Sequence, residues 1–347
     1  MQESRKIRIG ISVGDLNGIG CEVILKTFED ARMLDFCTPV IFASNKTMSQ
    51  QKKLLGITVN YNGVQAASQT IDKKINVVNV WKETPEINFG EATETGGKYA
   101  IKSLRAAVKA LKESHIDALV TAPINKNNIQ ADDFKFPGHT DYLAQELAGQ
   151  SLMFMVTDDL KVGLLTDHVA VKDAPAAITP ELVKAKVSTI ADSLKRDFGI
   201  RKPKIALLGI NPHSGDNGII GNEDDTVLKP VIQELSDAGN LVFGPYAADS
   251  FFGSDSYKKF DAILAAYHDQ GLIPFKTLSF GKGVNYTAGL NKVRTSPDHG
   301  TAYEIAGKGK ADPGSFKEAV FTAIHIVRKR KEYDGISKNP LKKMKMK

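Results

Sequence analysis

Short apolar runs alternate with amphipathic segments along most of this chain. The runs are rich in β-branched side chains, which is typical of buried strands. They predict strands at residues 7–13, 39–43, 75–80, 117–121, 205–210, 241–243 and 262–266. Between residues 96 and 113 the apolar positions lie three or four residues apart, as on one face of a helix. This alternation of strands and helices predicts an α/β fold with a mainly parallel sheet.

The same pattern predicts one antiparallel pair and several further helices. Apolar runs at 152–156 and 162–165 flank Asp158 and Asp159, which predicts a hairpin. One helix is expected to follow the glycine-rich loop at 14–20 and to end at about residue 32. Further helices are expected at 47–55, 96–113, 138–147, 180–198, 224–238, 298–306 and 315–329. No linker rich in glycine, proline or serine divides the chain. We therefore expect two interwoven α/β/α lobes around the sheet.

Three histidines follow strand-like runs in the same way. His168, His213 and His268 each come shortly after such a run, and 45 to 55 residues separate them. Because the carboxyl ends of parallel strands lie on one edge of a sheet, these imidazoles can converge. Three imidazoles with an open position are typical of a catalytic divalent metal site. Neighbouring carboxylates could orient the rings, namely those of Asp167, Asp216 and Asp269. The alternative is three separate histidines that each form their own hydrogen bonds.

A second group of polar residues predicts an anion site. His139 and Thr140 open a helix and offer an imidazole, a hydroxyl and free backbone N–H groups. Lys276, Asn285 and Arg294 would complete a site for a phosphate or a carboxylate, since arginine can bind both oxygens of such a group. The alternative interpretation is a helix cap by Thr140 and three unrelated surface residues.

The glycine-rich loop at 14–20 resembles a dinucleotide-binding turn only weakly. Its glycines do not have the spacing G-x-G-x-x-G, and no acidic residue ends the next strand. The loop is therefore also consistent with a plain strand-to-helix turn.

The charge of the chain is concentrated at its C-terminus. The formal net charge is +6, but residues 328–347 contain nine Lys/Arg and two Asp/Glu and therefore carry +7. The rest of the chain is close to neutral, which argues against nucleic-acid binding. We expect residues 1–334 to form one catalytic unit, and residues 335–347 to be a disordered basic tail.

Composition and the N-terminal residues predict a cytoplasmic protein. The two cysteines, Cys21 and Cys37, form no disulfide framework. No signal-peptide pattern precedes the first predicted strand, and no apolar run reaches the ~18 residues of a membrane span. We expect neither a membrane nor a nucleic acid as a partner.

Several sequence blocks together resemble one enzyme family. The blocks occur in order between about residues 5 and 330, and they are Gly14-Asp15-x-x-Gly18-Ile19-Gly20-x-Glu22, Thr121-Ala-Pro-Ile-Asn-Lys126, Pro137-Gly-His-Thr-Asp141, Asp167-His168, Asn211-Pro-His-Ser-Gly215, Gly244-Pro-Tyr-Ala-Ala-Asp249, Tyr267-His-Asp-Gln-Gly-Leu272 and Arg294-Thr-Ser-Pro-Asp-His-Gly-Thr-Ala302. In these blocks the chain resembles the 4-hydroxythreonine-4-phosphate dehydrogenases of pyridoxal 5′-phosphate biosynthesis. One departure is Cys21, where such families often have proline.

The resemblance implies a fold like that of isopropylmalate dehydrogenase, with the active-site cleft between the lobes. It implies NAD as cofactor, and the segment with His299, Gly300 and Ala302 is similar to the adenine-side NAD segment of those relatives. It implies a divalent metal, zinc with magnesium or cobalt as alternatives, and an obligate homodimer that shares the metal site. The implied metal ligands are His168, His213 and His268. The implied substrate ligands are His139, Thr140, Lys276, Asn285 and Arg294.

The implied reaction oxidises the C3 hydroxyl of 4-(phosphooxy)-L-threonine with NAD, and the resulting 3-keto acid loses CO2 to give 3-amino-2-oxopropyl phosphate. The metal would lower the pKa of the alcohol, and Lys276, Asp249 or an activated water would take its proton. Similar sequences oxidise threonate or erythronate 4-phosphate, which remain alternatives. A metal-dependent hydrolase or lyase, an acyltransferase on a similar fold and a non-enzymatic binding module are the rival classes.

Overall fold

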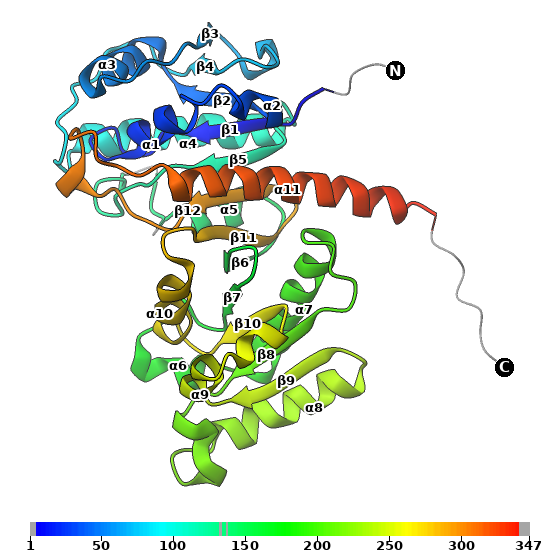
Figure 1. Cartoon of the computed structure of the whole chain (residues 1–347). Coiled ribbons are helices and arrows are strands. Elements are labelled where there is room, and N and C mark those ends of the chain that lie inside the picture. Colours follow the sequence, from blue (N-terminus) through cyan, green and yellow to red (C-terminus); the bar gives the residue numbers. More distant parts are fainter. Residues whose placement is uncertain (1–4, 132–133, 137, 340–347) are drawn as a thin grey trace.

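A computed structural model describes residues 5–131, 134–136 and 138–339. In these residues twelve strands form one sheet, in the order β3-β4-β2-β1-β5-β12-β11-β6-β7-β10-β8-β9. Figure 1 shows the sheet running the length of an elongated molecule. The strands are β1 (Arg8–Ser12), β2 (Thr38–Ala43), β3 (Asn62–Val64), β4 (Asn76–Asn79), β5 (Ala118–Thr121), β6 (Gly149–Val156), β7 (Lys161–Leu164), β8 (Lys204–Leu208), β9 (Leu241–Tyr246), β10 (Ala262–Ala265), β11 (Val284–Leu290) and β12 (Val293–Pro297).

The sheet has two parallel halves joined by an antiparallel centre. Strands β3, β4, β2, β1, β5 and β12 are parallel neighbours, and so are β7, β10, β8 and β9. Between the halves, β12 pairs antiparallel with β11, β11 with β6, and β6 with β7. The chain crosses into the second half at β6 and returns through β11 and β12. The prediction of interwoven α/β lobes around a mainly parallel sheet is confirmed.

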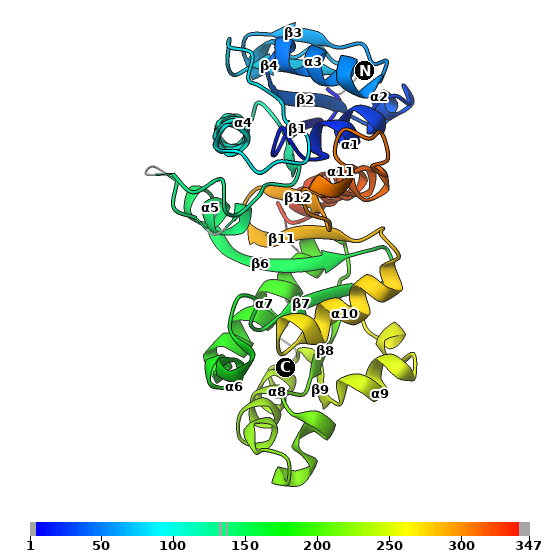
Figure 2. The same ribbon diagram turned by 90° about the vertical axis from the view of Figure 1, so that its left-hand side faces the viewer.

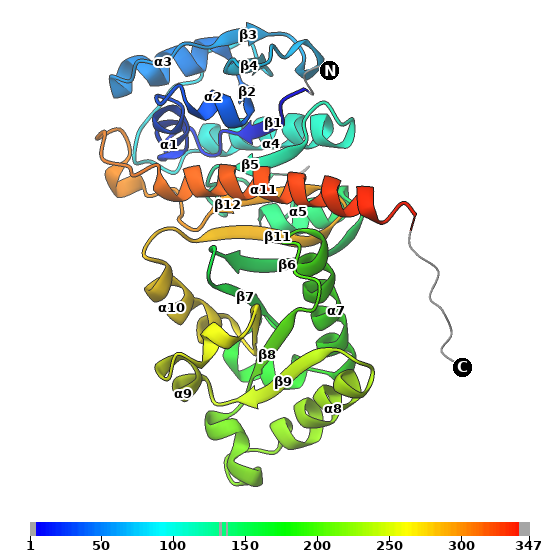
Figure 3. The ribbon, with the colours of Figure 1, turned by 45° about the vertical axis from the view of Figure 1, so that its right-hand side comes forward.

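Helices cover both faces of each half, as Figures 2 and 3 show. They are α1 (Gly20–Thr27), α2 (Met33–Phe36), α3 (Asn45–Leu55), α4 (Glu94–Lys112), α5 (His139–Glu146), α6 (Ala174–Ala177), α7 (Pro180–Arg196), α8 (Lys229–Asp237), α9 (Ala248–Gly253), α10 (His268–Ser279) and α11 (Gly314–Ile336). Ile9 and Ile11 face one core cluster, and Val40 and Phe42 face another on the opposite side of the sheet. Burial on both faces explains why the strands read as short continuous apolar runs.

Local chemistry sets several helix boundaries where the sequence predicts them. Thr179 accepts a hydrogen bond from the backbone N–H of Leu182 and caps α7, with Pro180 in the first turn. Ser44 and Thr93 cap α3 and α4 in the same way. Among the described residues, no helix combines the length and the apolar character needed to cross a membrane.

Three local predictions are wrong, and one hairpin was not predicted. The first helix does not reach residue 32, because α1 ends at Thr27 and Asp30 then accepts the backbone N–H of Arg32 in a turn. Residues 298–306 form a loop with only a 3-10 turn at Tyr303–Ile305, since Ala302 adopts a left-handed conformation. The sheet contains a second hairpin, β11–β12, which the pattern misses. Helix α11 continues to Ile336, two residues into the predicted tail, and residues 340–347 of that tail lie outside the described residues.

Candidate functional site

A cavity of about 300 Å³ lies where the two halves of the sheet meet. The first half lines it with the end of β5, the start of α5 and part of β12, and the antiparallel centre with residues of β6 and β11. The second half lines it with residues after β7 and β10. The cavity brings together nine of the predicted site residues, His139, Thr140, His168, His268, Lys276, Asn285, Arg294, His299 and Gly300. It agrees with the expectation of a cleft between lobes.

Arg294 is a buried cation that has no acidic partner among the described residues. Its side chain extends from the central strand β12 and is 2% exposed. The guanidinium donates to the hydroxyl of Thr121 at 2.7 and 3.2 Å and to the hydroxyl of Thr287 at 3.1 Å. Burial lowers the pKa of this guanidinium, because a charge removed from water loses its hydration. Neutral hydroxyls only partly replace that hydration, so the site favours an anionic ligand.

His139 lies beside Arg294 as a neutral ring. Burial, and then the positive charge of Arg294, lowers the pKa of His139 well below its usual value. Its Nε2 atom is buried and has no hydrogen-bond partner within residues 5–131, 134–136 and 138–339. His139 is the first residue of α5, so the free N–H groups at the start of this helix lie at the cavity as well.

Three residues of the same cavity each have a buried polar atom with no hydrogen-bond partner in the part of the chain that the structure describes. These atoms are His139 Nε2, Asn285 Oδ1 and His299 Nε2. Buried polar atoms in native proteins normally have a partner, so their convergence indicates a polar ligand. Lys276 adds a second cation at the rim and donates to the backbone carbonyl of Asp298 at 3.3 Å. Together these groups can hold a small molecule that carries negative charge and hydroxyl or amino groups.

The sequence interpretation assigned no role to three further residues of this cavity. Thr121 holds the guanidinium of Arg294, and Lys126 and Asp298 line the cavity wall. Thr121 and Lys126 belong to the block at 121–126, which lies at the end of the strand predicted at 117–121. Because ligands bind at the carboxyl ends of parallel strands, this position could have identified both residues.

The three predicted metal ligands do not converge in one chain. His168 and His268 both line the cavity, since β7 and β10 are paired neighbours. His213 is exposed and does not line the cavity; it lies in a left-handed turn after β8, with φ of 51°. Among the described residues, no group of three His, Cys, Asp or Glu side chains could hold a metal ion. One chain alone therefore does not fit the predicted three-histidine site.

Two of the three neighbouring carboxylates contact the histidines. Asp269 lies 2.7 Å from Nδ1 of His268 and can orient that ring. Asp167 accepts the backbone N–H of His168 and so holds the backbone at this position.

Two other predicted site residues lie outside the cavity lining. Asp249 is exposed in the first turn of α9. Ala302 lies in the loop that packs on the glycine-rich loop at 14–20, where Ile19 N–H donates to the carbonyl of Thr301 at 3.0 Å. Tyr303 donates to the buried carboxylate of Asp15 at 2.8 Å in the same contact. Residues 299–303 thus connect the cavity to the first strand-to-helix turn.

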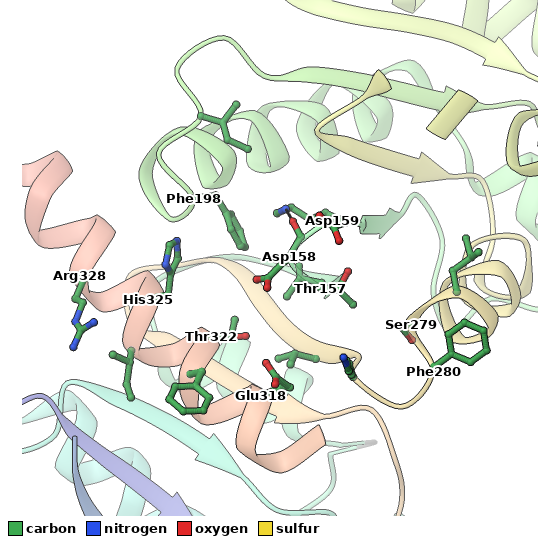
Figure 4. Close-up of a pocket in the computed structure, with 18 of the residues that line it drawn as sticks. Thr157, Asp158, Asp159, Phe198, Ser279, Phe280, Glu318, Thr322, His325 and Arg328 are labelled. Carbon is green, nitrogen blue, oxygen red and sulfur yellow. Dashed lines mark hydrogen bonds between the residues drawn. The ribbon is translucent and has the colours of Figure 1, made fainter. Parts of the chain in front are cut away.

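A larger groove of about 970 Å³ lies between α11, the β6–β7 turn and the loop after α10. Figure 4 shows Asp158 and Asp159 facing His325 and Glu318 across it, with Phe198 at one side. None of the predicted site residues lines this groove. Because the buried, unpartnered polar groups converge in the smaller cavity, we assign the candidate active site there.

The neutral state of His139 predicts a pH dependence of stability. In the unfolded chain this imidazole binds a proton near pH 6.5, whereas in the folded protein it stays neutral. Below about pH 6.5 the unfolded state therefore binds more protons, and the free energy of unfolding falls by up to about 1.4 kcal/mol per pH unit. Urea unfolding of ligand-free protein at pH 7.5 and 5.5 should show a smaller loss in His139→Gln than in the parent. The matched control is His115→Gln, which makes the same replacement at a histidine outside the cavity. If this control loses as little stability as His139→Gln, the effect is not specific to His139. Equal losses in the parent and in His139→Gln would contradict the prediction.

Comparison with known proteins places this architecture in a family. The profile described as "Pyridoxal phosphate biosynthetic protein PdxA" matches residues 35–323. A 4-hydroxythreonine-4-phosphate dehydrogenase from Bacteroides thetaiotaomicron is 46% identical, over 98% of this chain and 94% of its own length. A D-threonate 4-phosphate dehydrogenase from Cupriavidus necator is 36% identical, over 93% and 98%. The crystal structure of a 4-hydroxythreonine-4-phosphate dehydrogenase from Klebsiella pneumoniae superposes with a TM-score of 0.81 at 30% identity, over 94% and 98%. The chain therefore belongs to the PdxA family of pyridoxal phosphate biosynthetic proteins.

Proposed function

We propose that this protein is an NAD-dependent dehydrogenase that oxidises 4-(phosphooxy)-L-threonine at C3 and releases CO2 to give 3-amino-2-oxopropyl phosphate. The observation that carries the proposal is the cavity, where the buried cation Arg294 and three buried polar atoms lack an acid and a hydrogen-bond partner, respectively, among the residues that the structure describes. Family membership and the name of the Bacteroides relative support the same activity. The proposed substrate carries a phosphate, a carboxylate, a hydroxyl and an amine, which match these groups.

The cations and the helix start give the substrate anions their binding positions. We expect Arg294 and Lys276 to bind the anionic ends, with His139 and Thr140 at the start of α5. Asn285 Oδ1 can only accept a hydrogen bond, so it would face a hydroxyl or amino group of the substrate. Fixed positions for both ends of a small substrate hold C3 in one place for hydride transfer.

A divalent metal, zinc or alternatively magnesium or cobalt, is part of the proposal as a site shared by two copies of the chain. His168 and His268 lie in one cavity and His213 lies outside it on the surface, so the third ligand would come from a second copy. Large exposed apolar side chains flank the loops that carry His168 and His213, namely Val169, Val171, Ile219 and Ile220. Such residues favour a covered surface, which supports a homodimer. The bound metal would act as a Lewis acid on the alcohol.

The remaining roles concern the proton and the cofactor. Lys276 lies in the cavity and is the better placed of the two predicted bases, because Asp249 does not line it. NAD would lie along His299, Gly300 and Ala302, which continue from the cavity to the loop at 14–20. The second candidate substrate is D-threonate 4-phosphate, which the name of the Cupriavidus relative supports.

The test is NADH formation by the purified protein with each candidate substrate, with and without a chelator. We expect turnover with 4-(phosphooxy)-L-threonine that the chelator abolishes and added zinc restores. A higher kcat/KM with D-threonate 4-phosphate would shift the substrate assignment. Absence of NADH with every phosphorylated hydroxy acid would contradict the dehydrogenase and favour a hydrolase or lyase.

A further inference from the structure

A side chain, and not the sheet ladder, joins the ends of β10 and β8, the strands that precede His268 and His213. Strand β10 pairs with β8 up to Leu264 and Leu207. In that register Ala266 would face Gly209 two residues further on, but β10 ends at Ala265 and β8 at Leu208. His268 follows Ala266 by two residues, and His213 follows Gly209 by four.

The amide of Gln270 lies between these two strand ends. Its Oε1 accepts the backbone N–H of Ala266 at 2.7 Å, and its Nε2 donates to the carbonyl of Gly209 at 2.7 Å. One side chain therefore satisfies a donor of one strand end and an acceptor of the next. In a sheet ladder the N–H of one strand would bond directly to the carbonyl of the other. Here the side-chain amide of Gln270 lies between the two groups and sets the distance between the strand ends.

Bonds on either side extend the bridge to the other histidine-bearing loops. The hydroxyl and the N–H of Thr166, two residues before His168, both donate to the carbonyl of Ala266, at 2.8 and 3.2 Å. Beyond Gly209, the fully buried carboxylate of Asp224 accepts the N–H groups of Ile210 and Asn211, at 2.8 and 3.0 Å. These bonds form a continuous row across the ends of β7, β10 and β8.

We propose that Gln270 is a positioning residue for the histidine site. It fixes the positions of His168 and His268, which line the chain's own cavity, relative to the position of His213. In the proposed dimer, His213 would bind the metal at the cavity of the second copy. The inference rests on the proposed function, since it presumes that the three histidines bind a metal across two copies. Gln270 is not one of the residues that line the cavity, and within the described part of the chain its side chain forms hydrogen bonds to Ala266 and Gly209.

The test compares metal binding by Gln270→Leu, Gln270→Glu and the parent. Leucine removes both bonds at similar volume, and glutamate keeps the acceptor for Ala266 but cannot donate to Gly209. Partners that orient metal ligands typically change the affinity 10- to 100-fold, so we expect the Kd for Co²⁺ to rise by about that factor in both variants. The visible absorption of bound Co²⁺ should change as well, because it reports ligand geometry. Both are measured by titration of chelator-treated protein.

A matched control separates positioning from loss of stability. Gln51 is fully buried in the other half of the molecule and donates to the carbonyl of Leu16 at 2.7 Å. Gln51→Leu should lower the melting temperature but leave Co²⁺ affinity and spectrum unchanged. Parental Co²⁺ binding by Gln270→Leu would overturn the inference and leave the proposed function intact. Absence of Co²⁺ binding by the parent would overturn both. If the leucine variant does not fold, the glutamate variant decides between the same outcomes.

Discussion

Replacing Arg294 by methionine is expected to lower kcat/KM by about 10²–10³-fold or more, the loss seen when a buried charge-stabilising donor is removed. The guanidinium is the buried cation of the cavity, and it offers several donors in a fixed plane to the substrate anion. Methionine fills a similar volume but provides no donor. The measurement is steady-state NADH formation with 4-(phosphooxy)-L-threonine.

The same substitution should leave the ligand-free protein equally stable or make it more stable. A buried charge without a counter-ion costs free energy in the folded state, and an apolar side chain of similar size removes that cost. The two hydroxyls that accept from Arg294, those of Thr121 and Thr287, can rotate towards other partners. Loss of activity with an unchanged or raised melting temperature would identify Arg294 as a binding residue.

Two variants sharpen this result. Arg294→Lys keeps the charge but loses the planar, bidentate geometry, so it should recover only a small part of the activity. Arg196→Met removes an arginine from the surface of α7, where it pairs with Asp334 at 3.4 Å, and should leave kcat/KM unchanged. Near-parental activity of Arg294→Met would show that the substrate anion binds elsewhere, for example at Lys276 alone.

The sequence predicts the parts of the fold where local pattern and tertiary role agree. Strands such as β1 and β2 are buried on both faces, so they read as apolar runs. The hairpin β11–β12 escapes notice for the opposite reason. Asn285, Thr287 and Arg294 are polar residues inside these strands. Asn285 and Arg294 line the cavity, and Thr287 accepts a hydrogen bond from Arg294. The residues that make the site functional are the ones that interrupt the strand pattern.

Convergence at a sheet edge could be predicted for two of the three histidines. The ends of β7 and β10 are adjacent, and His168 and His268 accordingly lie in one cavity. His213 follows β8, the strand next to β10, but the chain there enters six consecutive residues with positive φ, from His213 to Gly218. Two of these are glycine, and Asp216 and Asn217 are residue types that adopt this conformation more readily than most. The Gly, Pro, Asn and Asp residues of this segment indicate a turn, but they do not specify its direction.

Removing the carboxylate of Asp197 is expected to destabilise the protein by about 3–5 kcal/mol, the usual cost of leaving one member of a buried ion pair alone. Asp197 accepts from Arg330 Nε at 2.7 Å and from Ser193 at 2.7 Å, and Tyr286 donates to the same carboxylate. The side chains of Asp197 and Arg330 are 3% and 9% exposed. The three elements involved, α7, β11 and α11, come from both halves of the sheet and from its centre. The network therefore joins the two halves behind the cavity.

Urea unfolding of Asp197→Ala measures this loss of stability. Two further variants show whether the loss comes from the buried ion pair. Asp334→Ala removes an exposed aspartate from the Arg196 pair and should cost less than about 1 kcal/mol. The double variant Asp197→Leu with Arg330→Met replaces both charges by apolar groups, so it should be far more stable than either single variant. Tyr286 then loses both of its charged neighbours, and burial alone keeps the pKa of its hydroxyl raised, so it stays neutral. A single variant no less stable than Asp334→Ala would mean that this network adds little to the joining of the two halves by the central strands of the sheet.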